Sequence, residues 1–234
     1  QSRSSAASDV YKRQALSSTN PYFTDDGISR SYEVFLRTTR PPTINTGDYR
    51  IRTTGANIKF GVPFTEFDTV FFGVGVERTE VQTYTGVTNY NDSPEVYKRY
   101  VDSINNVQND ASNPNSAFSQ GVHNASTTGL PLTAAWQRDN RDSALVPTRG
   151  RYQRANFEFS PAGDANYYRA TYQHQYFKPL FTNVTLALNG EINYGKGLGG
   201  KNYPIFKNFY GGGIGSVRGL SLIHISEPTR PERI

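Results

Sequence analysis

The strongest constraint on the fold of this sequence is a two-residue alternation of apolar and polar side chains. In segment 70–76, valine or phenylalanine occupies every even position, while positions 73 and 75 are glycine. In segment 56–62, alanine, isoleucine, phenylalanine and valine likewise alternate with asparagine, lysine and glycine. A period of two belongs to a β-strand, whose successive side chains point to opposite faces. The same period recurs in residues 31–37, 130–136 and 184–194, and two further strands are expected at 151–160 and 166–179. The sequence therefore predicts an all-β fold.

The polar face of these strands stays polar in mid-strand, which favours a wet barrel interior over the shared core of a soluble sandwich. Glu33, Glu77 and Glu191 could suggest carboxylate pairs for acid–base chemistry, but they fall on this face, where a solvated charge needs no further role. Only 35% of residues are hydrophobic, yet the chain holds 16 tyrosines and 14 phenylalanines, and it has no apolar run of 18 residues. This combination suits membrane-spanning strands with one wet face, whereas no helix is expected to span a membrane.

The predicted connections sort by length. Shorter ones fall at 24–30, 63–68, 143–150 and 180–183, and they alternate along the chain with longer ones. The longer connections are residues 40–48, 85–122, 161–165 and those from 195 onward. Short turns on one side and long loops on the other are typical of outer-membrane barrels. We therefore predict an incomplete antiparallel transmembrane β-barrel of about seven strands, part of a larger barrel, with long extracellular loops and a short helix within 94–107.

The apolar positions of these strands are predicted to face lipid, with Trp136 as an anchor at the membrane interface. The predicted lipid-facing residues are Ile58, Phe60, Val62, Val70, Phe72, Val74, Val76, Leu130, Leu132, Trp136, Leu186 and Leu188. A soluble β-sheet binding module is the alternative, but it would leave this apolar band exposed to water.

The two ends of the chain lack the alternation of the middle. Residues 1–14 and 221–234 resemble translated sequencing-adapter sequence, and we expect them to be foreign to the fold. The expected domain is a partial outer-membrane barrel over residues 15–220.

A glycine-rich arm near the C-terminal end leads to a single cation. Gly211, Gly212, Gly213 and Gly215 allow the backbone to turn freely, and the motif Val217, Arg218, Gly219 follows. A guanidinium on such an arm is suited to a bidentate, charge-assisted contact elsewhere in the fold. The alternative is a solvated turn with an incidental arginine.

Other chemical signals in the sequence are weak. Residues 195–202 nearly match a phosphate-binding loop, but Asn202 replaces the required serine or threonine and Pro204 follows shortly. His123 and His174 lie far apart, and the chain has no cysteine, so no metal site is expected. The net charge of +5 is scattered, so nucleic acid is not an expected partner. We predict no enzyme activity, no catalytic residue and no cofactor.

Several specific motifs resemble the bacterial surface antigen family, whose members assemble β-barrel proteins in the outer membrane. The matching segments, in the family's order, are residues 20–27, 147–150, 194–201, 208–210 and 214–219. The resemblance covers about residues 16–219 and implies a fragment of a sixteen-stranded barrel that follows periplasmic POTRA domains. The fragment would run from the end of strand four through strand eleven into the sixth extracellular loop. Residue 220 is leucine where the family has phenylalanine.

The resemblance also implies location, partners and a role for Arg218. The family resides in the bacterial outer membrane, among its lipids, and folds and inserts unfolded outer-membrane proteins without a catalytic group. Accessory assembly lipoproteins are expected to bind through periplasmic domains outside this chain. In the family the loop-six arginine pairs with acidic side chains of later strands, so Arg218→Ala in the intact protein should weaken loop docking and impair assembly. A pore or transporter of the same superfamily, exporting a single partner protein, is the alternative function.

Overall fold

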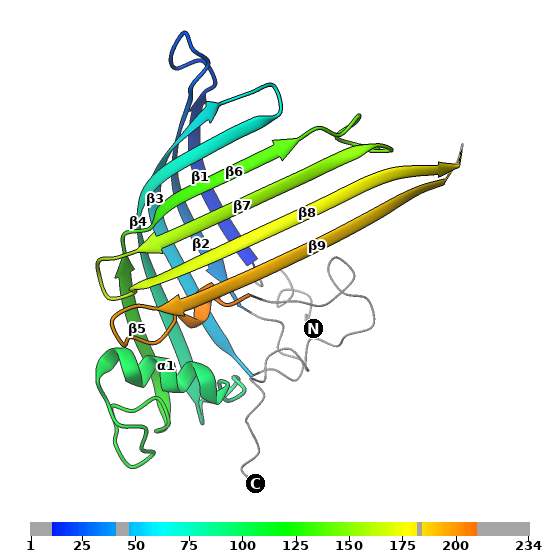
Figure 1. Cartoon of the computed structure of the whole chain (residues 1–234). Helices are drawn as coiled ribbons and strands as arrows, with labels where there is room; N and C mark the ends of the chain where they lie inside the picture. The colour runs from blue at the N-terminus through cyan, green and yellow to red at the C-terminus, as the bar shows by residue number, and fades with distance from the viewer. Residues whose placement is uncertain (1–10, 41–46, 182–183, 210–234) are drawn as a thin grey trace, which may run out of the picture.

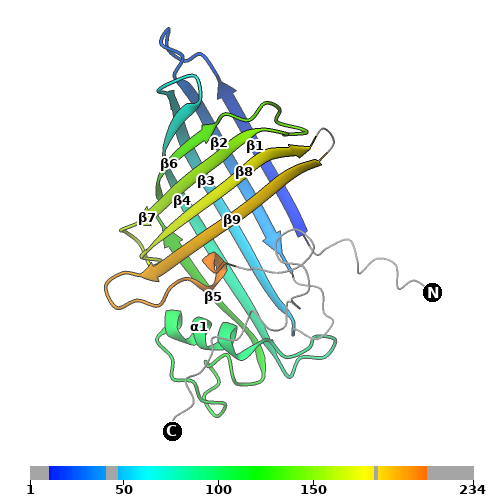
Figure 2. The same cartoon turned by 45° about the vertical axis from the view of Figure 1, so that its right-hand side comes forward.

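The computed structural model describes residues 11–40, 47–181 and 184–209, which form one curled antiparallel sheet (Figures 1 and 2). The strands follow the order β1-β2-β3-β4-β6-β7-β8-β9, and β5 pairs with β4 beside this path. The strand bounds are β1 Tyr11–Asn20, β2 Ser29–Thr39, β3 Tyr49–Pro63, β4 Asp68–Thr85, β5 Gly121–Gly129, β6 Leu132–Asp139, β7 Gly150–Ser160, β8 Tyr167–Phe181 and β9 Val184–Gly197. The helix α1 spans Glu95–Asn105, and a single 3-10 turn, η2, spans Ile205–Lys207.

The described residues contain nine strands, two more than the seven or so predicted, and β1 and β5 account for the difference. In β1, residues 11–14 pair with residues 36–39 of β2, inside the stretch that we predicted to be foreign. That boundary stays a prediction. No helix in the described part of the chain is long and apolar enough to cross a membrane.

β5 and β6 act as one long strand beside β4. Gly129 of β5 pairs with Glu77, Leu132 of β6 pairs with Val74, and the Pro131 carbonyl between them accepts the Gly75 N–H at 3.0 Å. Only β6 continues the sheet, because β7 pairs with β6 and not with β5. Strands β3, β4 and β5 consequently extend past β6 and β7 toward α1 (Figure 1).

The loop that joins β4 to β5 folds back over this extension. α1 confirms the helix expected within 94–107, and it packs on one face of β3, β4 and β5, which we call the inner face. The buried core there comprises Val81, Tyr97, Tyr100, Val101, Ala117, Ala125 and Ile205. Burial raises the pKa of the Tyr100 phenol to about 12. The long loop is thus a packed structure with a core of its own.

The polarity of the two faces reverses along β4. Up to Val76, the outer face is apolar and the inner face carries Gly73, Gly75 and Glu77. Beyond that point, the outer face carries exposed Arg78 and Glu80, while Val81 on the inner face is fully buried under α1. β3 shows the same reversal, with outer residues 52 and 54 exposed and inner residues 49 and 51 packed against the core. The apolar outer band therefore ends at one level on both strands.

The described connections alternate between the two ends of the sheet as predicted, but they do not sort strictly by length, because 161–166 is shorter than 140–149. The turns at 21–28, 64–67 and 140–149 lie at the end of the sheet away from α1, whereas 86–120 and 161–166 lie at the α1 end (Figure 1).

Candidate functional site

The twelve residues predicted to face lipid share the outer face, opposite α1. The strand register pairs several of them with one another, as in Ile58 with Val74 and Val70 with Trp136. None of the twelve is buried, and the exposed fraction of Val74 is 49%. The Trp136 indole N–H donates to Asp68 at 3.2 Å, near the turn end of the sheet. Their position on one exposed face is as expected, and their contact with lipid stays a prediction.

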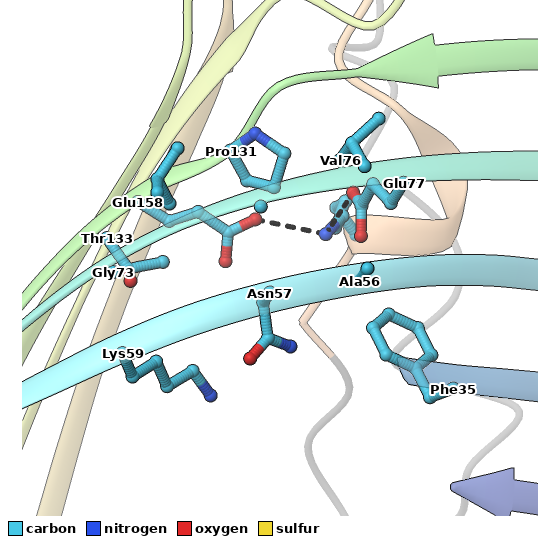
Figure 3. Close-up of a pocket in the computed structure, with 13 residues that line it drawn as sticks. Phe35, Ala56, Asn57, Lys59, Gly73, Val76, Glu77, Pro131, Thr133 and Glu158 are labelled. Atoms are coloured by element: carbon cyan, nitrogen blue, oxygen red, sulfur yellow. Dashed lines mark hydrogen bonds and ion pairs between the residues drawn. The ribbon is translucent and has the colours of Figure 1, made fainter. Parts of the chain in front are cut away.

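The inner face carries a small pocket of about 140 Å³ at the level of the apolar band (Figure 3). Its wall includes Asn57 and Lys59 of β3, Gly73 of β4 and Thr133 of β6. A Cβ at position 73 would lie 2.4 Å from the Thr133 hydroxyl oxygen, so a larger residue there would have to displace the Thr133 side chain. Because Gly73 and Gly75 of β4 have no side chain, the pocket has room for a side chain from another part of the chain, such as Lys207.

An ion-pair cluster closes one side of this pocket. The Lys207 ammonium lies 2.6 Å from a carboxylate oxygen of Glu77 on β4 and 3.0 Å from one of Glu158 on β7 (Figure 3). The Tyr167 hydroxyl of β8 donates a short hydrogen bond to Glu158 and lies 3.4 Å from Glu77. The side chains of Lys207, Glu77 and Glu158 are only 15%, 12% and 14% exposed. One cation therefore serves two largely buried carboxylates from different strands.

Lys207 reaches the cluster because the chain after β9 turns back into the concave side of the sheet. Tyr203 packs edge-on against Tyr167, with ring centres 5.9 Å apart, and donates its hydroxyl to the Lys207 carbonyl at 3.0 Å. Gly195 lies beneath the Tyr203 ring, where a Cβ would come within 2.7 Å of the phenolic oxygen. Burial raises the pKa of Tyr203. Phe209 adds a contact, since the Arg169 guanidinium carbon lies 4.7 Å from its ring centre.

The inner-face glutamates occupy the predicted face, but their surroundings differ. Glu33 is bonded to Arg13 at 3.0 Å, and Glu191 to Asn193 at 2.8 Å. We expected Glu77 to be a solvated charge, and this was wrong, because the segment after β9 covers it and supplies Lys207. Lys207 was not singled out from the sequence, although it directly precedes the motif at 208–210.

The weak chemical signals stay weak in three dimensions. Residues 195–202 form the end of β9 and a turn, and the only helical element that follows in the described chain is the three-residue η2. His123 contacts Ser119 and His174 contacts Tyr172, so they lie in separate environments. The described residues contain no group of three potential metal ligands among His, Cys, Asp and Glu. The glycine arm (Gly211, Gly212, Gly213, Gly215) and the motif Val217, Arg218, Gly219 lie outside the described residues, so their docking stays a prediction.

Known proteins with related sequences are assembly factors of the outer membrane. The chain is 38% identical over 209 residues to the outer membrane protein assembly factor BamA of Neisseria meningitidis serogroup B, covering 88% of this chain and 24% of that protein. It is 26% identical over 219 residues to BamA of Nitratidesulfovibrio vulgaris, covering 92% of this chain and 23% of that protein. The chain thus spans about a quarter of the length of these curated relatives.

A solved structure and a family model agree with these matches. The crystal structure of BamA from Haemophilus ducreyi lacking POTRA domains 1–3 superposes with a TM-score of 0.75 at 24% sequence identity, over 89% of this chain and 37% of that one. That likeness establishes the fold as part of a transmembrane β-barrel. The Omp85 superfamily domain matches residues 3–228. The chain therefore belongs to the Omp85 superfamily of outer-membrane β-barrel proteins.

Proposed function

We propose that this chain is the barrel portion of a factor that folds and inserts β-barrel proteins into the bacterial outer membrane. The observation that carries the proposal is the 38% identity, over most of the chain, to a relative named as an outer-membrane protein assembly factor. The lumen geometry supports it, since the segment after β9 occupies the inner side of the sheet through Lys207, Glu77 and Glu158. A wide, water-filled pore would instead leave this side of the sheet open, whereas a transporter of the same superfamily need not.

The proposed partners follow from the two faces of the sheet. Lipid would cover the apolar outer band from Ile58 to Val76 and its neighbours on β6 and β9. Unfolded outer-membrane proteins would be the clients, and accessory lipoproteins would bind through periplasmic domains outside this chain. Exposed strand edges in a barrel can template an incoming strand by backbone pairing, which requires no catalytic group or cofactor. We therefore propose a non-enzymatic role.

Reconstitution tests this function. The intact protein would be placed in phospholipid vesicles, and an unfolded outer-membrane barrel protein added in urea. Folding of the client, followed by its altered electrophoretic mobility without heating, should be faster than in protein-free vesicles. Equal folding rates, together with ion conductance through the reconstituted protein, would contradict the assembly function and favour the pore.

The same assay examines the proposed docking role of Arg218. Arg218→Ala in the intact protein should leave the barrel folded but slow client insertion and make the loop more sensitive to protease. Normal insertion with unchanged loop cleavage would reject that role, without affecting the assembly function itself.

A further inference from the structure

The segment of residues 201–209 contacts two parts of the protein at once. On the α1 side, Ile205 is 5% exposed within the core under the helix, and the Phe206 ring packs edge-on against Tyr100 at 6.1 Å between ring centres. The Asn202 amide also donates to Ser103 of α1 at 3.3 Å. These contacts join the segment to the extracellular helix.

On the other side, the segment is held to the barrel wall. Lys207 directly follows Phe206 in η2, and its ammonium reaches Glu77 of β4 and Glu158 of β7. Thus three consecutive residues of one short turn bridge the α1 core and the lumenal wall. Tyr203 and Phe209 add aromatic contacts to the wall. The Lys201 ammonium donates to two carbonyl oxygens of the β7–β8 connection.

The charge balance makes Lys207 the critical member of this bridge. Without its ammonium, Glu77 and Glu158 would lose the only cation that forms an ion pair with either of them among the described residues, and only Arg169, opposite Glu158 in the β7–β8 register, would remain nearby. Removal of one partner from a buried charge cluster is strongly destabilising, because the remaining charges stay desolvated and repel each other. Loss of the Lys207 ammonium should therefore release the segment 201–209 from the wall, and not only weaken its contacts there.

We propose that Lys207 is a lumenal latch, a positioning residue that fixes segment 201–209 between α1 and the β4–β7 wall. The glycine-rich stretch begins at Gly211, four residues later. The latch thereby fixes the chain up to Phe209, two residues before that stretch, by an anchor on β4 and β7. The structural latch does not depend on the proposed assembly function. Only its expected effect on client insertion rests on that function, so the labelling test and the insertion test can fail independently.

Cysteine labelling in the intact outer-membrane protein tests the latch directly. The present sequence contains no cysteine, so Ile205→Cys introduces a reporter buried under α1. A membrane-impermeant maleimide should modify this cysteine slowly when Lys207 is present. In Lys207→Met, labelling should be about tenfold faster or more, the effect of losing a charged hydrogen bond of roughly 1.4 kcal/mol or above.

Matched variants separate the latch from a general loss of charge. Lys201→Met removes a lysine of the same segment whose ammonium reaches only the carbonyl oxygens of Gly163 and Asp164, and labelling should stay near the parent rate. Lys207→Arg should also label slowly. The exchange Lys207→Glu with Glu158→Lys keeps one cation between two carboxylates, and it should restore protection that Lys207→Glu alone removes.

The outcomes are decisive in either direction. Fast labelling in Lys207→Met, with recovery in the charge exchange, supports the latch, and slower client insertion in the same variant would extend it to function. Unchanged labelling in Lys207→Met, or equal labelling in Lys201→Met, overturns it. If Lys207→Met fails to fold, the double variant Glu77→Gln with Glu158→Gln removes the same attraction without leaving facing charges. Slow labelling in that variant would overturn the latch too.

Discussion

Single glycines on the inner face decide how closely the segment after β9 approaches the sheet. Gly195 of β9 lies under the Tyr203 ring, and an added Cβ would come within 2.7 Å of the phenolic oxygen. Gly190, on the same strand, has no atom within 4 Å of its added Cβ. Gly195 faces the inner side of β9 and Gly190 faces the outer side, so only Gly195 is covered by another part of the chain.

We expect Gly195→Ala to displace Tyr203 and to lower stability by about 1–3 kcal/mol, the usual cost of overpacking. Gly190→Ala is the control and should leave stability nearly unchanged. Urea unfolding of the intact protein in detergent micelles, followed by tryptophan fluorescence, measures both. Equal midpoints for the two variants would show that Tyr203 does not depend on close contact with β9.

The sequence predicts the face that a residue occupies, because the face depends only on the two-residue period of a strand. Val74 and Leu188 were placed on the outer face because side chains alternate strictly in a strand. The pairing of Glu77 with Lys207 could not be predicted, since these residues are 130 positions apart in the sequence. Only the return of the chain into the lumen brings them together, and no local pattern encodes that return.

At the scale of elements, α1 and the loop that follows it are held by one buried carboxylate. Asp102 is fully buried, and it accepts hydrogen bonds from the Ser116 hydroxyl and the Ala117 N–H, each at 2.6 Å. Its backbone carbonyl also accepts the Val107 N–H at 2.9 Å. The side chain thus ties the end of α1 to the return path of the loop toward β5.

Replacement of Asp102 by alanine should loosen the 106–120 segment. Two buried groups would lose their acceptor, at a cost of about 1–3 kcal/mol for each unsatisfied group. Hydrogen exchange of the intact protein should then be faster for peptides covering 106–120. Glu95→Ala is the control, because the Glu95–Arg99 pair is exposed and contributes little. Similar exchange in both variants would argue against a structural role for Asp102.

The sequence predicted the helix α1 but not the strand β5. α1 was expected because a polar loop of this length commonly contains structure of its own. β5 was missed because its outer positions after Val122 are the polar residues Asn124, Ser126 and Thr128, and its inner positions are glycine, His123, alanine and threonine. A strand that stands outside the apolar band has no reason to alternate between apolar and polar residues.

At the scale of the whole molecule, the reversal of polarity along β3 and β4 marks where the proposed membrane band ends. The outer face changes from valine and phenylalanine to Arg78 and Glu80 within a single strand. The inner face changes in the opposite sense, from glycine and Glu77 to buried Val81. A sheet in lipid must be apolar outside and can be wet inside, whereas a sheet in water under a helix needs the reverse. One strand therefore crosses both environments.

This interpretation predicts that arginine substitutions on the outer face of β4 depend on height. Val74→Arg should cost about 2–4 kcal/mol if Val74 lies near the middle of the bilayer, because charge on a lipid-facing strand is expensive there. Glu80→Arg, three outer-face positions further along β4, places a second arginine opposite Arg52, but in water this repulsion should cost only about 0.2–1 kcal/mol. Unfolding by urea of the intact protein in phospholipid bilayers measures the two costs. Equal tolerance at both positions would place Val74 outside the lipid, and the outer band would then have to be covered by protein.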